Sequence, residues 1–234
     1  MVLPSFPNVD LFSAAVNALN GAIVAQNPSH NRGYTAAGVL MMGFFGGIGG
    51  GVSRDVLLNQ IPSPFKDPNY FFACFLMGLL GMAIYRYAAS REELFHTRLR
   101  EYLKSFSLPW FAILGAHKAL EQGLGFWGAV LVGLVATTAG GVVIDLFSRI
   151  TPVIVRADNQ HATTAVLAST VYILLAQHFK SSNSFFPVTL IAFAVAFTFR
   201  VLAVRDHWAS IVPFCPPPAD GSGVGPTAAP PPVR

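Results

Sequence analysis

The stretch with the most chemical character is a run of glycines that ends in two charges. Five glycines occupy the six positions from Gly46 to Gly51, and Arg54 and Asp55 follow closely. Each glycine costs up to about 1 kcal/mol relative to alanine in a helix interior, so the run disfavours regular helix. Helix packing needs only two small residues four apart, and backbone freed within lipid must face water or protein. We therefore favour a kinked segment that lines water over a segment that only packs.

A milder version of the run occurs later, in the sequence TTAGGVVID. Thr137 and Thr138 offer hydroxyl groups there, and Gly140 and Gly141 precede the acid Asp145. Charged residues beside such a run either mark a route for ions or anchor the helix end at a membrane interface. The residues alone leave both interpretations open.

The composition defines the environment of these residues. Of 234 residues, 53% are apolar and 11% charged, and the mean hydropathy is +0.53. A soluble domain carries about 25% charged residues, so the sequence indicates an integral membrane protein and excludes most soluble enzymes. The net charge of +4 lacks the dense basic face that nucleic acids require. We expect no enzyme activity and no nucleic-acid partner.

Other sequence features suggest no metal, cofactor or leader. Two cysteines, Cys74 and Cys215, form neither a disulfide framework nor a metal site, and the six histidines are expected at interfaces or in loops. The glycine run leads into Arg-Asp rather than Lys-Ser/Thr, so it is not a nucleotide-binding loop. The first ten residues lack a basic region, so no cleavable signal peptide is expected.

Charges divide the chain into seven apolar stretches that, with their flanks, are long enough to cross a bilayer. The fourth stretch is short and carries His117, Lys118 and Glu121, so a soluble or interfacial helix is the alternative there. The predicted spans are residues 11–26, 34–57, 70–85, 108–121, 126–144, 162–177 and 185–201.

Basic residues are distributed unevenly between the two sides that these spans create. Eleven of the fifteen lysines and arginines fall on the side of the C-terminus, and four fall on the side of the N-terminus. Cytoplasmic loops carry the excess of basic residues. The N-terminus is therefore predicted outside the cell and the C-terminus in the cytoplasm.

The chain contains an internal repeat at an offset of 90 residues. The pattern Gly-Gly-Val-x-x-Asp, with a proline seven residues later, begins at Gly50 and again at Gly140. Each copy holds three predicted spans, an odd number, so the second copy must be inverted, as in transporter-like folds with a permeation site between repeats. Asp55 and Asp145 would then lie at opposite mouths, where their fields concentrate cations.

These features predict an all-α membrane protein with seven transmembrane helices, arranged as two inverted three-helix repeats plus a seventh helix. The predicted boundaries are an N-terminal segment 1–10, a membrane domain 11–208 and a disordered, proline-rich cytoplasmic tail 209–234. Within the membrane domain the repeats cover residues 11–90 and 107–180, and the extra helix covers residues 185–203. Small residues on the first and fourth spans allow close helix contact within or between subunits: Gly21, Ala22, Gly115 and Ala116.

Four motifs together resemble the trimeric intracellular cation channel (TRIC) family in its prokaryotic branch. They are GGIGGGVSRDVLL with a proline after it, LGAHKALEQGL, AGGVVIDLFSRITPVIVR and FRVLAVRDHW, and the likeness runs from residue 17 to residue 208. The resemblance implies a homotrimer in the cell (inner) membrane, surrounded by lipids, with one pore per subunit. It implies bent second and fifth spans that line a path for monovalent cations, potassium especially, and no cofactor beyond the permeant K⁺ or Na⁺.

The resemblance also implies which residues line or gate the pore. Two departures weaken the symmetry between the halves, because Ala139 and Ile144 stand where the first motif has a glycine and an arginine. Asp145 is then expected to lack a neighbouring cation. The implied pore and gating residues are Gly49, Gly50, Gly51, Ser53, Arg54, Asp55, Lys118, Thr137, Thr138, Gly140, Gly141 and Asp145.

Three functions remain open from the sequence: a potassium-permeable channel, a secondary transporter of a small solute such as glycine, and a non-conducting scaffold or lipid-binding protein. A coupled carrier often has a charge deep in the bilayer, and only Lys118 is a candidate, which favours the channel. Lys118 has three interpretations of its own. It extends to the headgroups, pairs with Glu121 on the same helix face, or faces the second or fifth span and gates the path.

Overall fold

The computed structural model describes residues 7–27, 33–88, 93–155, 160–179, 185–206 and 208. Within these ranges the chain forms eight α-helices and one short 3₁₀-helix, and no strand. The elements are α1 (Pro7–Ala25), α2 (Ala36–Leu57), α3 (Ser63–Lys66), α4 (Asn69–Ala88), α5 (Glu93–Glu121), α6 (Phe126–Phe147), η1 (Val153–Val155), α7 (His161–His178) and α8 (Phe185–Arg205). The all-α prediction is confirmed, and each predicted span falls on one of the seven long helices. The short helix α3 was not predicted.

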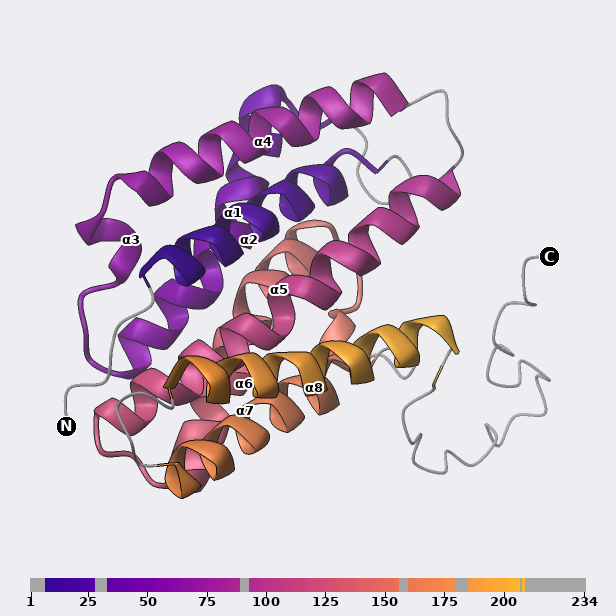
Figure 1. Ribbon diagram of the computed structural model, residues 1–234. Helices are drawn as coiled ribbons and strands as arrows, with labels where there is room; N and C mark the ends of the chain where they lie inside the picture. The colour runs from indigo at the N-terminus through magenta and orange to yellow at the C-terminus, as the bar shows by residue number, and fades with distance from the viewer. Residues whose placement is uncertain are drawn as a thin grey trace, which may run out of the picture.

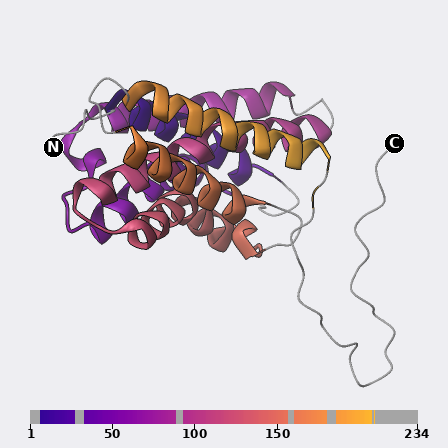
Figure 2. The same ribbon diagram turned by 60° about the horizontal axis from the view of Figure 1, so that its bottom comes forward.

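The long helices lie side by side in two groups of three with one helix added (Figure 1). Helices α1, α2 and α4 pack against one another, and α5, α6 and α7 do the same. The groups meet where α2 packs on α6 and α1 packs on α5. Helix α8 packs on α5 and α7, and Figure 2 shows it running along one side of the molecule. The α2–α6 contact therefore lies at the centre of the molecule, between the two groups.

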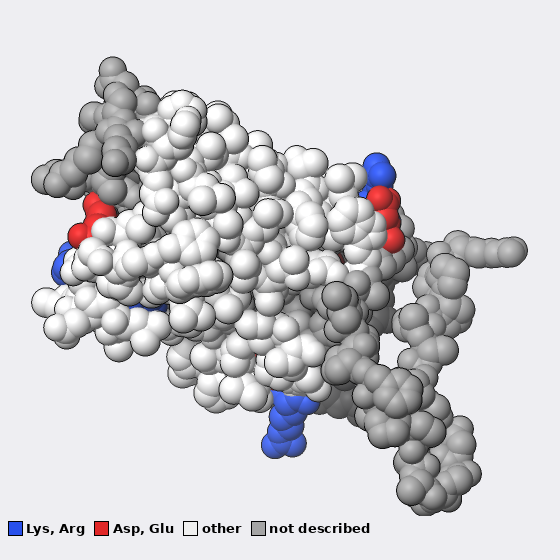
Figure 3. All heavy atoms as spheres, turned by 90° about the horizontal axis from the view of Figure 1, so that it is seen from below, with Lys and Arg blue, Asp and Glu red and all other residues white. Residues whose placement is uncertain are grey.

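Four helices of the described chain are long and apolar enough to cross a bilayer on their own: Ala36–Leu57, Asn69–Tyr87, Phe126–Phe147 and Phe186–Arg205. Large apolar side chains such as Phe72, Leu76 and Leu131 are more than half exposed on these helices, which suits contact with lipid tails. In Figure 3 uncharged residues cover most of the visible face, and charged ones appear at its two ends and its lower edge. The chain is a multi-pass membrane protein.

Two helices begin before the predicted spans, across charges that were taken as markers of loops. Helix α1 begins at Pro7, so Asp10 is inside the helix. Helix α5 begins at Glu93, well before the predicted start of the fourth span at residue 108. Part of the extra length is stabilised by a partly buried ion pair, in which Arg200 of α8 donates to Glu101 at 2.9 Å. The predicted tail, residues 209–234, lies outside the described residues.

Matching small residues hold the helices of each group close together. A Cβ atom at Gly21 would lie 2.5 Å from the carbonyl oxygen of Met42, and one at Gly115 would lie 2.8 Å from the Cα of Gly133. Ala22 and Ala116, beside these two glycines, are fully buried. Of the two alternatives left open, these residues therefore serve contacts within the chain, α1 on α2 and α5 on α6.

The same backbone turn follows α2 and α6. Asn59 and Arg149 adopt left-handed conformations, with φ of 52° and 55°, and end the two helices 90 residues apart. Such a residue after the last helical turn is a common way to end a helix. In each turn an aspartate oxygen accepts a backbone N–H eight residues later: Asp55 from Ser63 and Asp145 from Val153, both at 2.8 Å. These bonds fix both carboxylates at the ends of the glycine-rich helices.

Candidate functional site

Helix α2 is continuous through its glycines, from Ala36 to Leu57, so the kink expected there does not interrupt the helix and stays a prediction. Several of these glycines instead allow contact with neighbouring backbones, which is the packing alternative. A Cβ at Gly47 would lie 2.8 Å from the carbonyl oxygen of Ala14, and one at Gly46 would lie 2.7 Å from that of Asn17. Both contacts are to α1. The cost of glycine in a helix is therefore offset by packing that no larger residue permits.

Helices α2 and α6 run antiparallel and touch through the two glycine motifs. A Cβ at Gly49 would lie 2.9 Å from the Cα of Gly140, and one at Gly50 would collide with the carbonyl oxygen of Ala136. One turn away, Gly46 faces Ile144. At Gly49 and Gly50 the backbone of α6 itself is the nearest neighbour, so the two helices are in direct contact at the middle of the α2–α6 contact. Asp55 and Asp145 lie beyond its opposite ends, as predicted.

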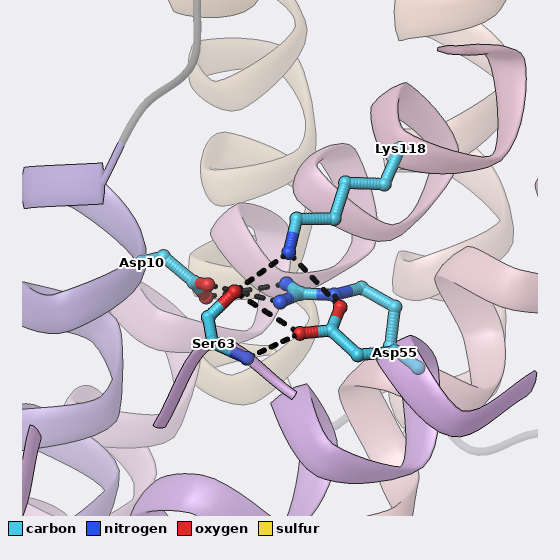
Figure 4. Close-up of polar contacts among 5 residues, drawn as sticks. Asp10, Asp55, Ser63 and Lys118 are labelled. Carbon is cyan, nitrogen blue, oxygen red and sulfur yellow. Dashed lines mark hydrogen bonds and ion pairs between the residues drawn. The ribbon is translucent and has the colours of Figure 1, made fainter. Parts of the chain in front are cut away.

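A buried group of polar side chains, which we call the Arg54 cluster, covers the α2 end of this contact (Figure 4). Arg54 has no exposed side-chain surface. Its guanidinium donates to both carboxylate oxygens of Asp10, at 3.2 and 2.9 Å, and to Asp55 Oδ1 at 2.7 Å. Paired in this way, a charge can remain buried. Of the two interpretations left open for this charge pair, an Arg54 that extends to the membrane interface does not fit its buried side chain.

Lys118 completes the Arg54 cluster from helix α5. Its Nζ donates to Asp55 Oδ1 and to Ser63 Oγ, both at 2.9 Å, and Ser63 Oγ donates to Asp55 Oδ2 at 3.1 Å (Figure 4). The cluster thus consists of Asp10, Arg54, Asp55, Ser63 and Lys118, from helices α1, α2, α3 and α5. Its two acidic and two basic groups balance each other.

The contacts of Lys118 show where its side chain lies, and this distinguishes between the three interpretations of its position. Its side chain is 22% exposed and bonded to α2 and α3, so it does not simply extend to the headgroups. The ion pair that Lys118 makes is with Asp55 and not with Glu121, the partner in the second interpretation. Glu121 lies 3.7 Å from His117 Nε2 instead. The position that remains is the one facing the second span.

Two members of the Arg54 cluster were missed in the sequence. Asp10 is 44 residues from Arg54, and Ser63 is 55 residues from Lys118, so no local pattern connects them. A signal for Asp10 did exist, because the predicted topology puts the start of the first span and the end of the second on one side. An arginine at the end of an apolar span requires an acid, and Asp10 is an acid on that side.

The other end of the α2–α6 contact opens into a small cavity, which we call the Thr137 cavity. Its walls come from α1, α2, α5, α6, α7 and η1, and the space for water-sized molecules is about 40 Å³. Thr137, Thr138, Gly141 and Asp145 line it together with Lys104. Lys104 therefore shares the cavity with Asp145, although the motif position beside Asp145 is held by Ile144. The two ends of the α2–α6 contact differ: four charged side chains and a serine lie at one end, and a small cavity lined by polar, charged and apolar residues lies at the other.

The remaining predicted residues are distributed along the same two helices. Gly51 is buried beside the Arg54 guanidinium, where a Cβ would lie 3.7 Å from Nη2. Ser53 is half-buried on α2 and does not line the cavity. His117 is not interfacial as expected: it is 3% exposed, and its Nδ1 lies 2.7 Å from the Tyr172 hydroxyl. In the described part of the chain no three His, Cys, Asp or Glu side chains are grouped to hold a metal ion.

The sequence and fold are similar to those of known membrane proteins. A family model described as glycine transporter matches residues 8–86 and 101–177, which is more than half of the chain. The solved structure of the TRIC orthologue from Rhodobacter sphaeroides has a TM-score of 0.73 and 26% identity, over 85% of this chain and 96% of that one. A second solved TRIC cation channel has a TM-score of 0.75 and 25% identity, over 91% of this chain and 98% of the other.

The chain belongs to the trimeric intracellular cation channel family. Among its relatives is a membrane protein of Deinococcus radiodurans, 32% identical over 73% of this chain and 76% of that protein. The resemblance drawn from the four motifs is confirmed. The family model matches the chain in two segments, one containing α1, α2 and most of α4 and the other containing α6 and most of α5 and α7. The solved TRIC structures to which the chain is similar are channels and not enzymes.

Proposed function

We propose that the chain is a channel for monovalent cations, permeable to potassium, with one conduction path per subunit between α2 and α6. The observation that carries the proposal is the composition of this contact. Two glycine-rich helices meet backbone to backbone, a polar cavity adjoins them on one side, and a balanced charge cluster covers the other. Solved TRIC cation channels with the same fold support the proposal.

The geometry corresponds to a closed path. Conduction requires the α2 and α6 backbones to separate near Gly50, and it requires Lys118 to leave Asp55. An ammonium at the constriction repels entering cations, so the Lys118–Asp55 contact is the proposed gate. Once Lys118 withdraws, Asp55 remains as a carboxylate at the mouth and attracts cations. Separation at a glycine contact needs no rearrangement of bulky side chains.

The two three-helix groups are proposed to be inverted repeats, with α8 as the seventh span. Three observations support this: the family model matches the chain in two segments, the turn after α2 recurs after α6, and α2 and α6 are antiparallel. With the excess of basic residues inside, the Arg54 cluster faces the outside and the Thr137 cavity faces the cytoplasm. The extracellular mouth is then the gated one.

Three such subunits are proposed to form the active assembly. This rests on the trimeric channel family to which the chain belongs. The small residues Gly21 and Gly115 are already used within the chain, so they do not form the subunit interface. Exposed apolar residues on the long helices provide surface both for the subunit interface and for membrane lipid. No cofactor is proposed beyond the permeant ion.

Reconstitution into planar bilayers tests the function directly. Purified protein under a potassium gradient should give unitary currents that reverse near the potassium potential, and chloride should not carry them. The mass of the detergent-solubilised protein, corrected for detergent, should correspond to three subunits. The competing carrier predicts something different: glycine uptake into vesicles that saturates, with no unitary current. That result would replace the channel by the transporter.

A further inference from the structure

We propose that the Thr137 cavity binds one partly dehydrated monovalent cation, held mainly by hydroxyl oxygens. The inference rests on the proposed cation permeation and adds a specific site to it. The cavity is lined by Ser107 on α5 and by Thr137 and Thr138 on α6. Thr137 lies halfway along α6, so the site reaches the middle of the membrane-spanning helix.

The hydroxyl groups that line the cavity have already used their protons. Thr137 Oγ1 donates to the carbonyl of Gly133, and Thr138 Oγ1 donates to that of Leu134, both at 2.8 Å. Ser107 Oγ donates to Asn17 Oδ1, also at 2.8 Å. A hydroxyl has one proton and two lone pairs. What these three groups can still offer is therefore lone pairs only, which attract cations and not anions.

Other groups on the walls favour a positive guest. Asp145 lines the cavity near the C-terminal end of α6, where the helix dipole also favours cations. Asn20, on the α1 wall, is 5% exposed, and its side-chain oxygen has no hydrogen-bond partner. A buried amide oxygen without a partner costs free energy, and a guest or a small rotation of the amide can relieve that cost.

The positive groups around the cavity keep such binding weak. Lys104 and His161 line it from α5 and α7, and the Arg200–Glu101 pair joins α8 to α5 nearby. The ammonium of Lys104 opposes a second positive charge and offsets part of the attraction of Asp145. A site on a conduction path must release its ion readily, so this opposition suits transit rather than storage. The volume of about 40 Å³ suffices for one ion with a few waters, because one water needs ~10–15 Å³.

Thallium serves as the probe, because it substitutes for potassium and scatters anomalously. Crystals of the full-length protein in thallium nitrate should show an anomalous peak in the Thr137 cavity. Thr137→Val combined with Thr138→Val keeps the shape but removes the two oxygens, so the peak should disappear and unitary conductance should fall severalfold. Thr137→Ser with Thr138→Ser keeps both oxygens and should retain the peak.

Thr164→Val is the matched control. Thr164 is fully buried and makes the same hydroxyl-to-carbonyl bond, to Gln160 at 2.6 Å, but it does not line the cavity. Its variant should keep both peak and conductance. A conducting wild type without a thallium peak overturns the site and leaves the channel intact. A peak that survives the double valine change also overturns the proposed site, because thallium would then be held without the two threonine hydroxyl oxygens. A thallium peak in a protein that gives no current supports the site and contradicts the channel.

Discussion

At the scale of single residues, the Arg54 cluster keeps four charges at the end of an apolar helix bundle. Arg54 is fully buried and bonded to two carboxylates, whereas Lys118 is partly exposed. Losing one partner of a buried ion pair leaves an uncompensated charge. The two basic residues therefore differ in their surroundings: Arg54 joins α1 to α2 inside the protein, and Lys118 is within reach of water.

We expect Arg54→Gln to destabilise the protein by about 3–5 kcal/mol, because the carboxylate of Asp10 would stay buried without its partner. The loss should appear as a lower melting temperature of the solubilised protein. Arg54→Gln combined with Asp10→Asn removes one charge of each sign and leaves the Asp55–Lys118 pair intact. The double variant should therefore be more stable than the sum of the single effects predicts. If the stability change of the double variant equalled the sum of the two single changes, the pairing of Arg54 with Asp10 would be contradicted.

Lys118→Gln should raise the open probability or change the voltage dependence without altering assembly, because it removes the ammonium bound to Asp55. Single-channel recording measures the first effect, and size-exclusion chromatography checks the second. Glu121→Gln is the control, since Glu121 lies on the same helix end but outside the Arg54 cluster, 3.7 Å from His117 Nε2, and should leave gating unchanged. A Lys118→Gln channel with wild-type gating would reduce Lys118 to a structural anchor.

Which of these residues could be predicted from the sequence depended on how far apart their partners are. Arg54, Asp55 and Lys118 were singled out from local context, and all three lie in one cluster. Asp10 was assigned to a terminal segment because a charge near the start of an apolar stretch resembles a boundary. Ser63 gave no signal, since its role depends on the turn that brings it back to Asp55. Contacts between residues that are far apart in the sequence depend on how the helices pack, and a local sequence pattern does not show this packing.

At the scale of elements, the two glycine motifs differ in their surroundings although their sequences are alike. Gly50 packs directly against the backbone of Ala136, whereas no atom lies within 4 Å of a Cβ built at Gly141. Our expectation from sequence treated both as bends. The repeat itself was predictable, because Gly-Gly-Val-x-x-Asp occurs twice; the neighbours of each copy were not, because they come from other helices.

Gly141→Leu should leave folding and assembly intact and reduce or abolish conduction, because its side chain would enter the Thr137 cavity without meeting backbone. Gly50→Leu should instead force α2 and α6 apart and lower the yield of assembled protein. Comparing the two by fluorescence-detected chromatography and bilayer recording separates blocking from misfolding. Equal folding yields for both variants would show that the α2–α6 contact at Gly50 is looser than described.

At the scale of the whole molecule, the charge distribution predicts orientation. The described structure brings the ends of α2 and α5 to one side, with Arg54 and Lys118, and the end of α6 to the other. Only four of the fifteen basic residues were assigned to the Arg54 side. A reporter fused to the C-terminus should therefore be active in the cytoplasm, and one placed after Pro62 should be active outside. A cytoplasmic signal at Pro62 would invert the assignment of both mouths.

The electrical neutrality of the Arg54 cluster limits how strongly voltage can act on it. Both of its carboxylates and the Arg54 guanidinium are buried and bonded to one another or to backbone inside the protein, whereas Lys118 is partly exposed and is the charge that moves in the proposed gate. One elementary charge crossing the full membrane field gains about 2.3 kcal/mol per 100 mV, roughly a fiftyfold change in an equilibrium. In the proposed gate Lys118 would travel only part of that distance. Each subunit would then carry less than one gating charge, and its opening should vary gently with membrane potential rather than switch steeply.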